Sequence, residues 1–324
     1  MNHNQKKFVV SHAPFWHNGS SISERSIHTM LAAIPAVAAG MYFYGMPALR
    51  VVALAIASAM LWELGMNYIM KMPTRIGDCN SALIGLLFAM LLPATAPWWL
   101  VIIGTFFAVI IGKEIYGGIG GNPFSPPIVA VAILMLSWPD LFDFYGALVN
   151  YNLSFSVNYP LESLKFLGPM SIADISIFDL LLGKQVGALG ATFALGLILG
   201  GIYLILRGFI RWEISISFIV GILITAHLFH VSDPNKYAGP LFHLLTGYTL
   251  IGAFFLLTDD ASSPSNFIPM LIYGAGAGFL TVLIRNIGAY VDGVVYAVLL
   301  INLTTPILDR IRPLAFGKAV EEDA

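Results

Sequence analysis

The chain has 324 residues, of which 58% are hydrophobic and only 10% are charged, and its formal net charge is −2. A mean hydropathy of +0.81 is typical of an integral membrane protein and excludes an ordinary soluble domain. The small net charge gives no sign of nucleic-acid binding. The single cysteine, Cys79, excludes an internal disulfide and a Cys-ligated cluster within the chain.

Apolar runs long enough to cross a bilayer recur along the whole sequence. A span needs about 20 apolar residues, and we predict about ten spans, at 27–45, 50–70, 80–95, 97–112, 125–142, 186–206, 214–230, 240–257, 268–285 and 291–308. The expected fold is an all-α polytopic membrane protein. Five spans fall on each side of one long polar connection, which indicates two five-helix halves with inverted topology, the plan of many transporters.

The distribution of Lys and Arg predicts an orientation. Most of the 16 basic residues fall on one set of connections, which the positive-inside rule assigns to the cytoplasm. The N-terminal segment 1–25 and the tail 311–324 are then cytoplasmic. The connection 143–185 faces outward between the halves 26–142 and 186–310. We expect an inner-membrane protein with both termini on the cytoplasmic side.

The stretch from Gly112 to Pro127 cannot form a continuous helix, because glycines and prolines crowd it. In lipid, broken backbone survives only where it is buried in protein or lines a cavity. Asn122 and Ser125 supply polar side chains there. We interpret this first break as a ligand site; the alternative is a plain turn between two spans.

A second polar break begins with Thr258, Asp259 and Asp260, directly after the span 240–257. The predicted topology puts it on the same side of the membrane as the first break. Broken helices in corresponding halves are the feature that points to a binding site in transporters.

Ionisable residues inside a membrane are candidates for function. Glu63 lies in the middle of a span, and we expect it near the first break as part of an ion path; the alternative is a glutamate hydrogen-bonded for packing. Lys113 and Glu114 flank the first break. Arg285 and Asp292 bracket the last loop and are expected at the membrane interface.

Four stretches carry a resemblance to a known family. The first reads Gly-Lys-Glu-Ile-Tyr-Gly-Gly-Ile-Gly-Gly-Asn-Pro-Phe-Ser-Pro from Gly112, and the others begin at Gly187, Phe255 and Arg285. They resemble segments of the RnfD/NqrB family, the large membrane subunits of ion-pumping Rnf and Nqr electron-transfer complexes. The resemblance covers nearly the whole chain. It implies a subunit that is not catalytic alone and that works with flavin- and iron–sulfur-carrying partners to move Na⁺ or H⁺.

The resemblance also implies a noncovalent flavin, riboflavin or FMN, near the cytoplasmic break. The residues that would hold it here are Gly117, Gly118, Gly120, Asn122, Ser125, Thr258 and Asp259. The family further esterifies FMN to a threonine on the outward loop. Tyr159 stands at that position, so we expect no covalent FMN. A serine replaces the family's asparagine at position 125.

No sequence motif of a soluble hydrolase, nucleotide-binding loop or metalloprotease is present, and we predict no metal site. Two alternatives to the flavin-binding subunit therefore stay open. The chain could be a transporter or channel, since broken helices in two halves also suit a solute pathway, or a scaffold subunit without flavin.

Overall fold

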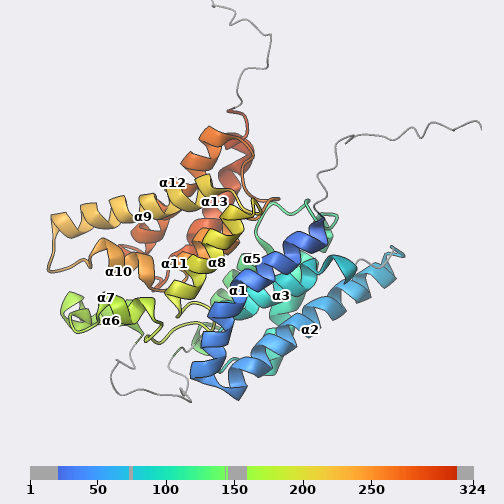
Figure 1. Cartoon of the computed structure of the whole chain (residues 1–324), viewed down its shortest axis with the longest axis horizontal. Coiled ribbons are helices and arrows are strands. Elements are labelled where there is room, and N and C mark those ends of the chain that lie inside the picture. Colours follow the sequence, from blue (N-terminus) through green and yellow to red (C-terminus); the bar gives the residue numbers. More distant parts are fainter. Residues whose placement is uncertain (1–20, 73–75, 143, 145–158, 312–324) are drawn as a thin grey trace, which may run out of the picture.

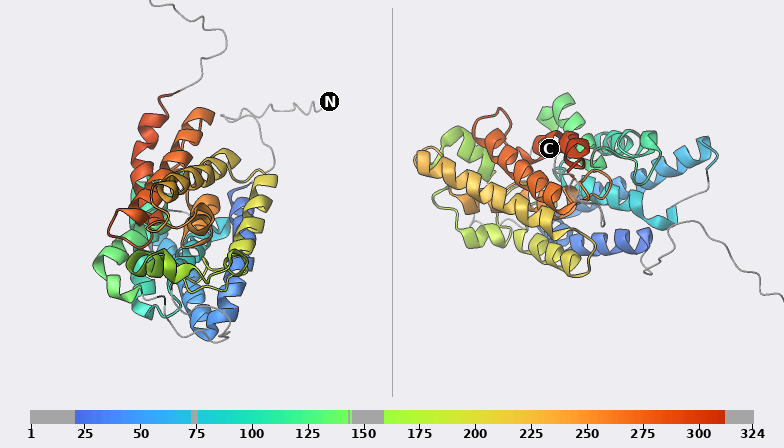
Figure 2. Two further views of the ribbon diagram at one scale, coloured as in Figure 1. Left: turned by 90° about the vertical axis from the view of Figure 1, so that its left-hand side faces the viewer. Right: turned by 90° about the horizontal axis from the view of Figure 1, so that it is seen from above.

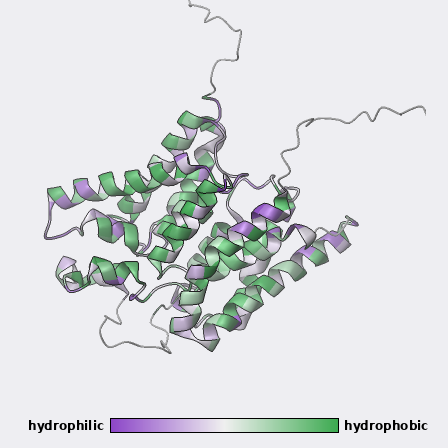
Figure 3. Cartoon of the chain, in the orientation of Figure 1, coloured by the Kyte–Doolittle hydropathy of each residue, from purple (hydrophilic) through white to green (hydrophobic). Residues whose placement is uncertain are grey.

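Every regular element in the described part of the chain is a helix. The computed structural model describes residues 21–72, 76–142, 144 and 159–311, and these ranges contain helices and no strand. Five helices are long and apolar enough to cross a membrane, and several shorter ones are also apolar. Figure 3 shows hydrophobic residues along most of their length. The prediction of an all-α polytopic membrane protein is confirmed.

The first half begins with two long helices. α1 (Ile22–Tyr44) starts where the Ser21 hydroxyl accepts a hydrogen bond from the Glu24 backbone N–H at 3.1 Å, which satisfies one of the free N–H groups of the first turn. It ends at Gly45, whose φ of 65° permits the sharp turn into α2 (Met46–Ile69). Three shorter helices follow: α3 (Asn80–Met90), α4 (Trp98–Phe106) and α5 (Pro126–Ser137).

The connection between the two halves is partly helical, with α6 (Pro160–Leu167) and α7 (Ile177–Leu181). The second half contains α8 (Ala194–Leu206), α9 (Trp212–Ser232), α10 (Pro240–Leu245), α11 (Thr249–Ile251), α12 (Phe267–Asn286) and α13 (Val294–Leu308). Short 3₁₀ turns cover Ile76–Asp78, Glu114–Tyr116, Pro139–Leu141 and Pro169–Ile172.

Two predicted spans differ from the structure because part of each is not helical. The span 186–206 becomes a helix only at Ala194, and the span 240–257 is interrupted between α10 and α11. The non-helical backbone of the first of these finds hydrogen-bond partners in the other half. The Gly190 N–H donates to the Met90 carbonyl at 2.9 Å, just where α3 ends. The backbone N–H and C=O groups of the interrupted span thus form hydrogen bonds inside the protein, because no water is available to them in lipid.

The two halves lie side by side. In Figures 1 and 2 the helices of the first half, blue to cyan, occupy one end of the molecule and the orange and red helices of the second half occupy the other. Within the halves, α2 packs on α3 and α4, and α9 packs on α12; between them, α1 packs on α8 and α5 on α13. A Cβ at Gly200 of α8 would collide with the Ala32 carbonyl of α1, so this contact requires a glycine. The inverted relation of the halves stays a prediction.

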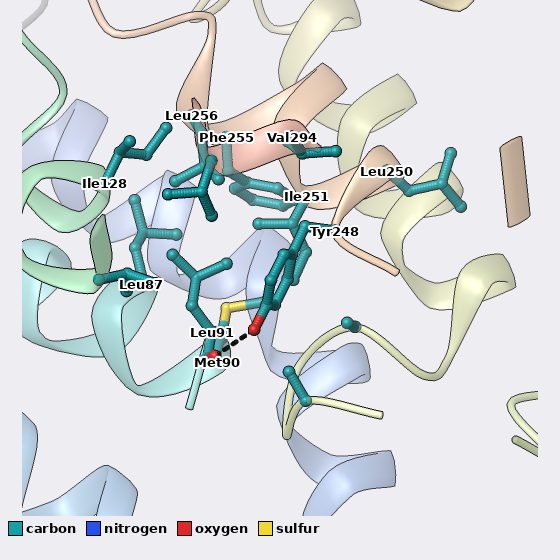
Figure 4. Packing of buried hydrophobic residues seen from close by; sticks show 14 of the residues in the cluster. Leu87, Met90, Leu91, Ile128, Tyr248, Leu250, Ile251, Phe255, Leu256 and Val294 are labelled. Atoms are coloured by element: carbon teal, nitrogen blue, oxygen red, sulfur yellow. Dashed lines mark hydrogen bonds between the residues drawn. The ribbon is translucent and has the colours of Figure 1, made fainter. Parts of the chain in front are cut away.

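The core between the halves is largely apolar and includes a hydrogen bond of a buried tyrosine. Figure 4 shows side chains from α3, α5, α11 and α13 meeting there, among them Leu87, Ile128 and Val294. The Tyr248 hydroxyl donates to the Leu91 carbonyl at 2.8 Å, directly past the end of α3. The phenol therefore satisfies a carbonyl that the helix itself leaves free.

Candidate functional site

The two breaks meet in space. α4 continues into a π-helical turn, Phe107–Ile111, and α11 continues into a second one, Gly252–Leu256; each of them leads directly into a break. Single π-helical turns occur frequently at functional sites. The Asn122 amide Nδ2 of the first break donates to Asp259 Oδ2 of the second at 2.9 Å. Residues that are far apart in sequence thus form one polar site.

A cavity of about 460 Å³, here called the large cavity, lies where the breaks meet. Ligand pockets for small molecules and cofactors have volumes of about 300–1,000 Å³. Of the seven residues predicted to hold a flavin, five line this cavity: Gly120, Asn122, Ser125, Thr258 and Asp259. The structure brings these five together, and it places Gly117 and Gly118 beside a different pocket.

The hydrogen bonds around Asn122 decide what it offers to a ligand. Its Nδ2 donates to the Phe124 carbonyl at 2.9 Å as well as to Asp259, so both amide hydrogens are used. The amide oxygen is the group left for a ligand, as an acceptor. Ser125 precedes α5 and lines the cavity, and its side chain makes no capping hydrogen bond. The Thr258 hydroxyl donates to the Phe254 carbonyl at 2.8 Å.

Asp259 is the acidic side chain of the cavity wall. Its Oδ2 also accepts a hydrogen bond from the Ser262 hydroxyl at 3.0 Å. Loss of hydration raises the pKa of the Asp259 carboxyl, and the hydrogen bonds from Ser262 and Asn122 oppose that shift. Asp259 is therefore a group that both accepts hydrogen bonds and holds a proton more readily than an exposed aspartate.

Charged residues surround the mouth of the large cavity. Arg25, at the start of α1, forms an ion pair with Asp260 of the second break. Near it, Glu24 lies 3.6 Å from Arg207, which follows α8. These pairs put both breaks on the side of the protein where α1 begins and α8 ends.

Glu63 lies beside the first break, where we expected it. Its Oε1 accepts a hydrogen bond from the Lys113 ammonium at 2.6 Å. The same ammonium donates to the Ser81 hydroxyl at 3.2 Å and lies 3.4 Å from Glu114 Oε1. Glu63 and Lys113 are each only 2% exposed. We call Glu63, Lys113 and Glu114 the acidic cluster.

A small pocket of about 10 Å³ borders the acidic cluster. Glu63, Glu114, Asn67, Gly117 and Gly118 all line it. A volume of about 10–15 Å³ on this measure is what a single water molecule requires. Asn67 follows Glu63 by one helical turn, so the i, i+4 spacing could have identified it from the sequence; Ser81 carried no such signal.

The glycines of the first break shape both sites through their backbone. Gly117, Gly118 and Gly120 have φ values of 100°, 94° and 87°, which residues with a side chain rarely adopt. Nothing lies within 4 Å of a Cβ built at Gly117 or Gly120. The requirement there is the left-handed turn itself.

Arg285 and Asp292 form a second buried ion pair. Their expected position at the membrane interface stays a prediction; within the protein both are buried, each at 4% exposed. Arg285 Nη2 donates to Asp292 Oδ1 at 2.9 Å, and Nη1 donates to the His243 carbonyl at 2.7 Å. Asp292 Oδ2 accepts from the Tyr248 N–H at 2.7 Å. The pair thus holds the break between α10 and α11.

Tyr159, at the position where the family esterifies FMN, precedes α6 and is buried. Its ring packs on Phe144, with 5.1 Å between ring centroids. Burial raises the pKa of the Tyr159 phenol well above its ordinary value, so the phenol stays neutral. Ser156, the nearest aliphatic hydroxyl before it, lies outside the described residues. Within the described part of the chain, no cluster of metal-ligating side chains is present.

The broken helices, the cavity between them and the buried ionisable residues belong to a polytopic membrane protein. Residues 9–317 match the NQR2, RnfD, RnfE family, and the chain belongs to this family.

The chain is similar to several curated relatives over almost its whole length. It is 34% identical to the D subunit of the ion-translocating oxidoreductase complex of Cronobacter sakazakii, covering 96% of this chain and 99% of that protein. It is 33% identical to the protein of the same name from Pectobacterium carotovorum, with the same coverage. For the corresponding protein of Escherichia coli the identity is 34%, over 96% of this chain and 98% of that one.

Proposed function

We propose that this chain is the D-type membrane subunit of an ion-translocating oxidoreductase complex and holds a noncovalent flavin in the large cavity. It would work in the inner membrane with partner subunits that carry flavin and iron–sulfur groups, as a part of the translocase that is not catalytic alone. The names and full-length coverage of its relatives support the first part. The large cavity, built from both breaks, is the observation that carries the second.

The residues of the large cavity fit a flat, hydrogen-bonding ring. Asn122 offers its amide oxygen to an imide N–H, and Ser125 offers a hydroxyl that donates or accepts. Asp259 fixes Asn122 from the opposite break at 2.9 Å. A bound flavin would supply the electron chemistry, while these side chains bind and orient it. Because riboflavin and FMN share this ring, the same contacts suit both.

The acidic cluster supports the ion-coupled part of the proposal. Glu63 is buried mid-span next to the first break, where an uncompensated carboxylate costs about 2.5–3.5 kcal/mol on insertion scales. Lys113 compensates one of the two carboxylates of the acidic cluster, and a cation of the transported kind, Na⁺ or H⁺, would compensate the other. The membrane side of the breaks, which we assign to the cytoplasm, rests on the distribution of Lys and Arg.

The flavin test uses the absorbance of this chain purified away from its partner subunits, because those partners carry flavin of their own in the proposed complex. A flavin band at about 450 nm, a property of the cofactor itself, separates the proposal from the transporter and scaffold alternatives. Asn122→Leu should lower the retained flavin about tenfold, because a buried hydrogen-bonding group contributes about 1–3 kcal/mol. The matched control is Asn235→Leu, an exposed asparagine of the loop before α10, which should retain full flavin. Equal flavin in both variants would refute this site.

Covalent FMN is tested separately by fluorescence in a denaturing gel. We expect no fluorescent band on this chain, because Tyr159 lacks the aliphatic hydroxyl that the family uses. A band that survives denaturation and maps to Ser156 or Thr192 by mass spectrometry would show a different attachment site. The gel compares the flavin fluorescence of the wild-type chain with that of Thr192→Val, a substitution at a buried residue.

A further inference from the structure

Lys113 borders both sites. Among the described residues, only Lys113 and Ile119 line the large cavity and also the small pocket. Ile119 carries no charge, so Lys113 is the one ionic side chain through which the two spaces touch. Its ammonium sits on the side of the small pocket, 2.6 Å from Glu63 Oε1.

Among the described residues, the acidic cluster is one positive charge short. It contains two carboxylates, Glu63 and Glu114, and a single ammonium, at 2.6 and 3.4 Å. Buried charges are stable only when they are paired, so a further cation or a proton completes the cluster. The small pocket beside both carboxylates has room for a particle of about the size of water.

Asn67 provides an independent sign that the small pocket takes a ligand. It is 3% exposed and lines the pocket. Its amide Nδ2 has no hydrogen-bond partner, although buried polar groups are almost always paired. A half-turn of the amide would present its oxygen instead, and oxygen atoms of carboxylates and amides are the ligands that hard cations prefer.

We propose that Lys113 links the two sites as a movable internal cation. In this structure its ammonium neutralises Glu63. When negative charge accumulates in the large cavity, the ammonium moves toward that charge, and an inorganic monovalent cation takes its place between Glu63 and Glu114 in the small pocket. Lysine suits this role because its charge sits on a flexible four-carbon stem.

The charges balance in each step. One electron, delivered by a partner subunit to the flavin of the proposed function, brings one negative charge into the large cavity. The Lys113 ammonium carries one positive charge toward it, and one Na⁺ or H⁺ enters the small pocket. When the electron leaves, the ammonium returns to Glu63 and displaces the cation. The inference rests on the proposed function for the source of that electron.

The test is site-resolved labelling of Glu63 in the whole purified complex with dicyclohexylcarbodiimide, which reacts with carboxyl groups in apolar surroundings. In the oxidised complex Lys113 should protect Glu63. After reduction with dithionite in choline chloride, labelling should rise roughly tenfold, and NaCl should restore protection. In Lys113→Met, Glu63 should label in both redox states, with protection by NaCl in both. If the coupled ion is the proton, the labelling of Glu63 should fall when the pH is raised and should not respond to NaCl.

Two variants serve as controls. Ser81→Ala removes one hydrogen bond to the ammonium and no charge, so its labelling should stay within about threefold of wild type. Glu63→Gln should lose the labelled peptide and so confirms the assignment. The link would be overturned if the labelling of Glu63 in the wild type did not change on reduction, or if Glu63 in Lys113→Met were labelled to the same extent as in the wild type. The first of these comparisons needs no substitution, so it holds even if the variant assembles poorly.

Flavin content, measured on the same preparations, keeps the two proposals apart. A complex whose chain holds no flavin, but in which Lys113→Met exposes Glu63, would refute the flavin site and leave the pairing of Lys113 with Glu63 intact. A flavin-loaded complex in which Glu63 responds neither to reduction nor to Lys113→Met would leave the flavin site and overturn the link.

Discussion

Two buried ionic groups in this protein are built in opposite ways. Arg285 and Asp292 carry one charge each, and their side chains bind backbone groups of three neighbouring segments, including the His243 carbonyl and the Tyr248 and Val294 N–H groups. Among the described residues, the three charges of the acidic cluster do not cancel, and the ammonium is held by side chains alone, those of Glu63, Ser81 and Glu114.

The difference separates a structural pair from a functional one. The guanidinium of Arg285 is fixed by its fork geometry on several acceptors, so movement would break many hydrogen bonds at once. The ammonium of Lys113 has a second carboxylate at 3.4 Å, a small pocket beside it and the large cavity along its stem. Burial alone thus does not distinguish the two; the charge balance and the free space do.

The largest effect is expected for Arg285→Met. It leaves Asp292 buried without its partner and frees the His243 carbonyl, which should cost about 3–5 kcal/mol of stability. We expect a strong loss of thermal stability and of assembled complex, measured by fluorescence-detected size-exclusion chromatography after heating. Lys236→Met, the same type of change at an exposed residue, is the control and should cost no more than about 0.5 kcal/mol. Equal thermal stability of the two variants would show that the buried pair of Arg285 and Asp292 does not stabilise the fold.

Lys113→Met sharpens the comparison, because its defect should be repairable. The uncompensated carboxylates can bind an added cation in the small pocket, and a ligand present at 100 times its Kd stabilises a protein by about 2.7 kcal/mol. We therefore expect the Tm of Lys113→Met to rise when choline chloride is replaced by NaCl at equal ionic strength. The Tm of Arg285→Met should not respond. If the Tm of Lys113→Met did not depend on the cation, the acidic cluster would be a structural ionic group like the pair of Arg285 and Asp292.

Asp259→Asn is expected to have the smallest effect, and it depends on pH. The pKa of Asp259 is raised by loss of hydration, so ionisation disfavours the folded state as pH rises through the ordinary aspartate range toward the raised value. At pH 7 the neutral asparagine should stabilise the protein by less than about 1 kcal/mol, or roughly 2 °C in Tm. At pH 4 the difference should vanish. A loss of stability at pH 7 would show that the charged form is the favoured one.

Much of the fold could be predicted, because a membrane span is identified by the apolar composition of its own residues. The long helices α1, α2, α9 and α12 follow apolar runs that need no partner to be identified. The interrupted spans could not be predicted, because the apolar run before α8 looks like any other. Its backbone leaves the helix to pair with Met90 of the other half, and a sequence read locally does not contain that partner.

The candidate site divides in the same way. The two breaks were visible from glycine, proline and acidic residues, but their meeting through Asn122 and Asp259 depends on tertiary packing. The sequence also could not predict that Gly117 and Gly118 lie apart from the large cavity. Their positive φ values turn the chain away from that cavity. Arg285 and Asp292 were identified as ionisable, yet only the structure shows that they bind each other.

The most direct test of the account is ion movement per electron in vesicles that contain the complex with Glu63→Gln. This substitution leaves one carboxylate for one ammonium, Glu114 for Lys113, so the acidic cluster becomes balanced and the protein should assemble with its flavin. The account predicts that electron transfer continues while Na⁺ or H⁺ uptake falls to about a tenth or less, since tenfold corresponds to about 1.4 kcal/mol of binding. Full coupling between electron transfer and ion uptake in Glu63→Gln would contradict it.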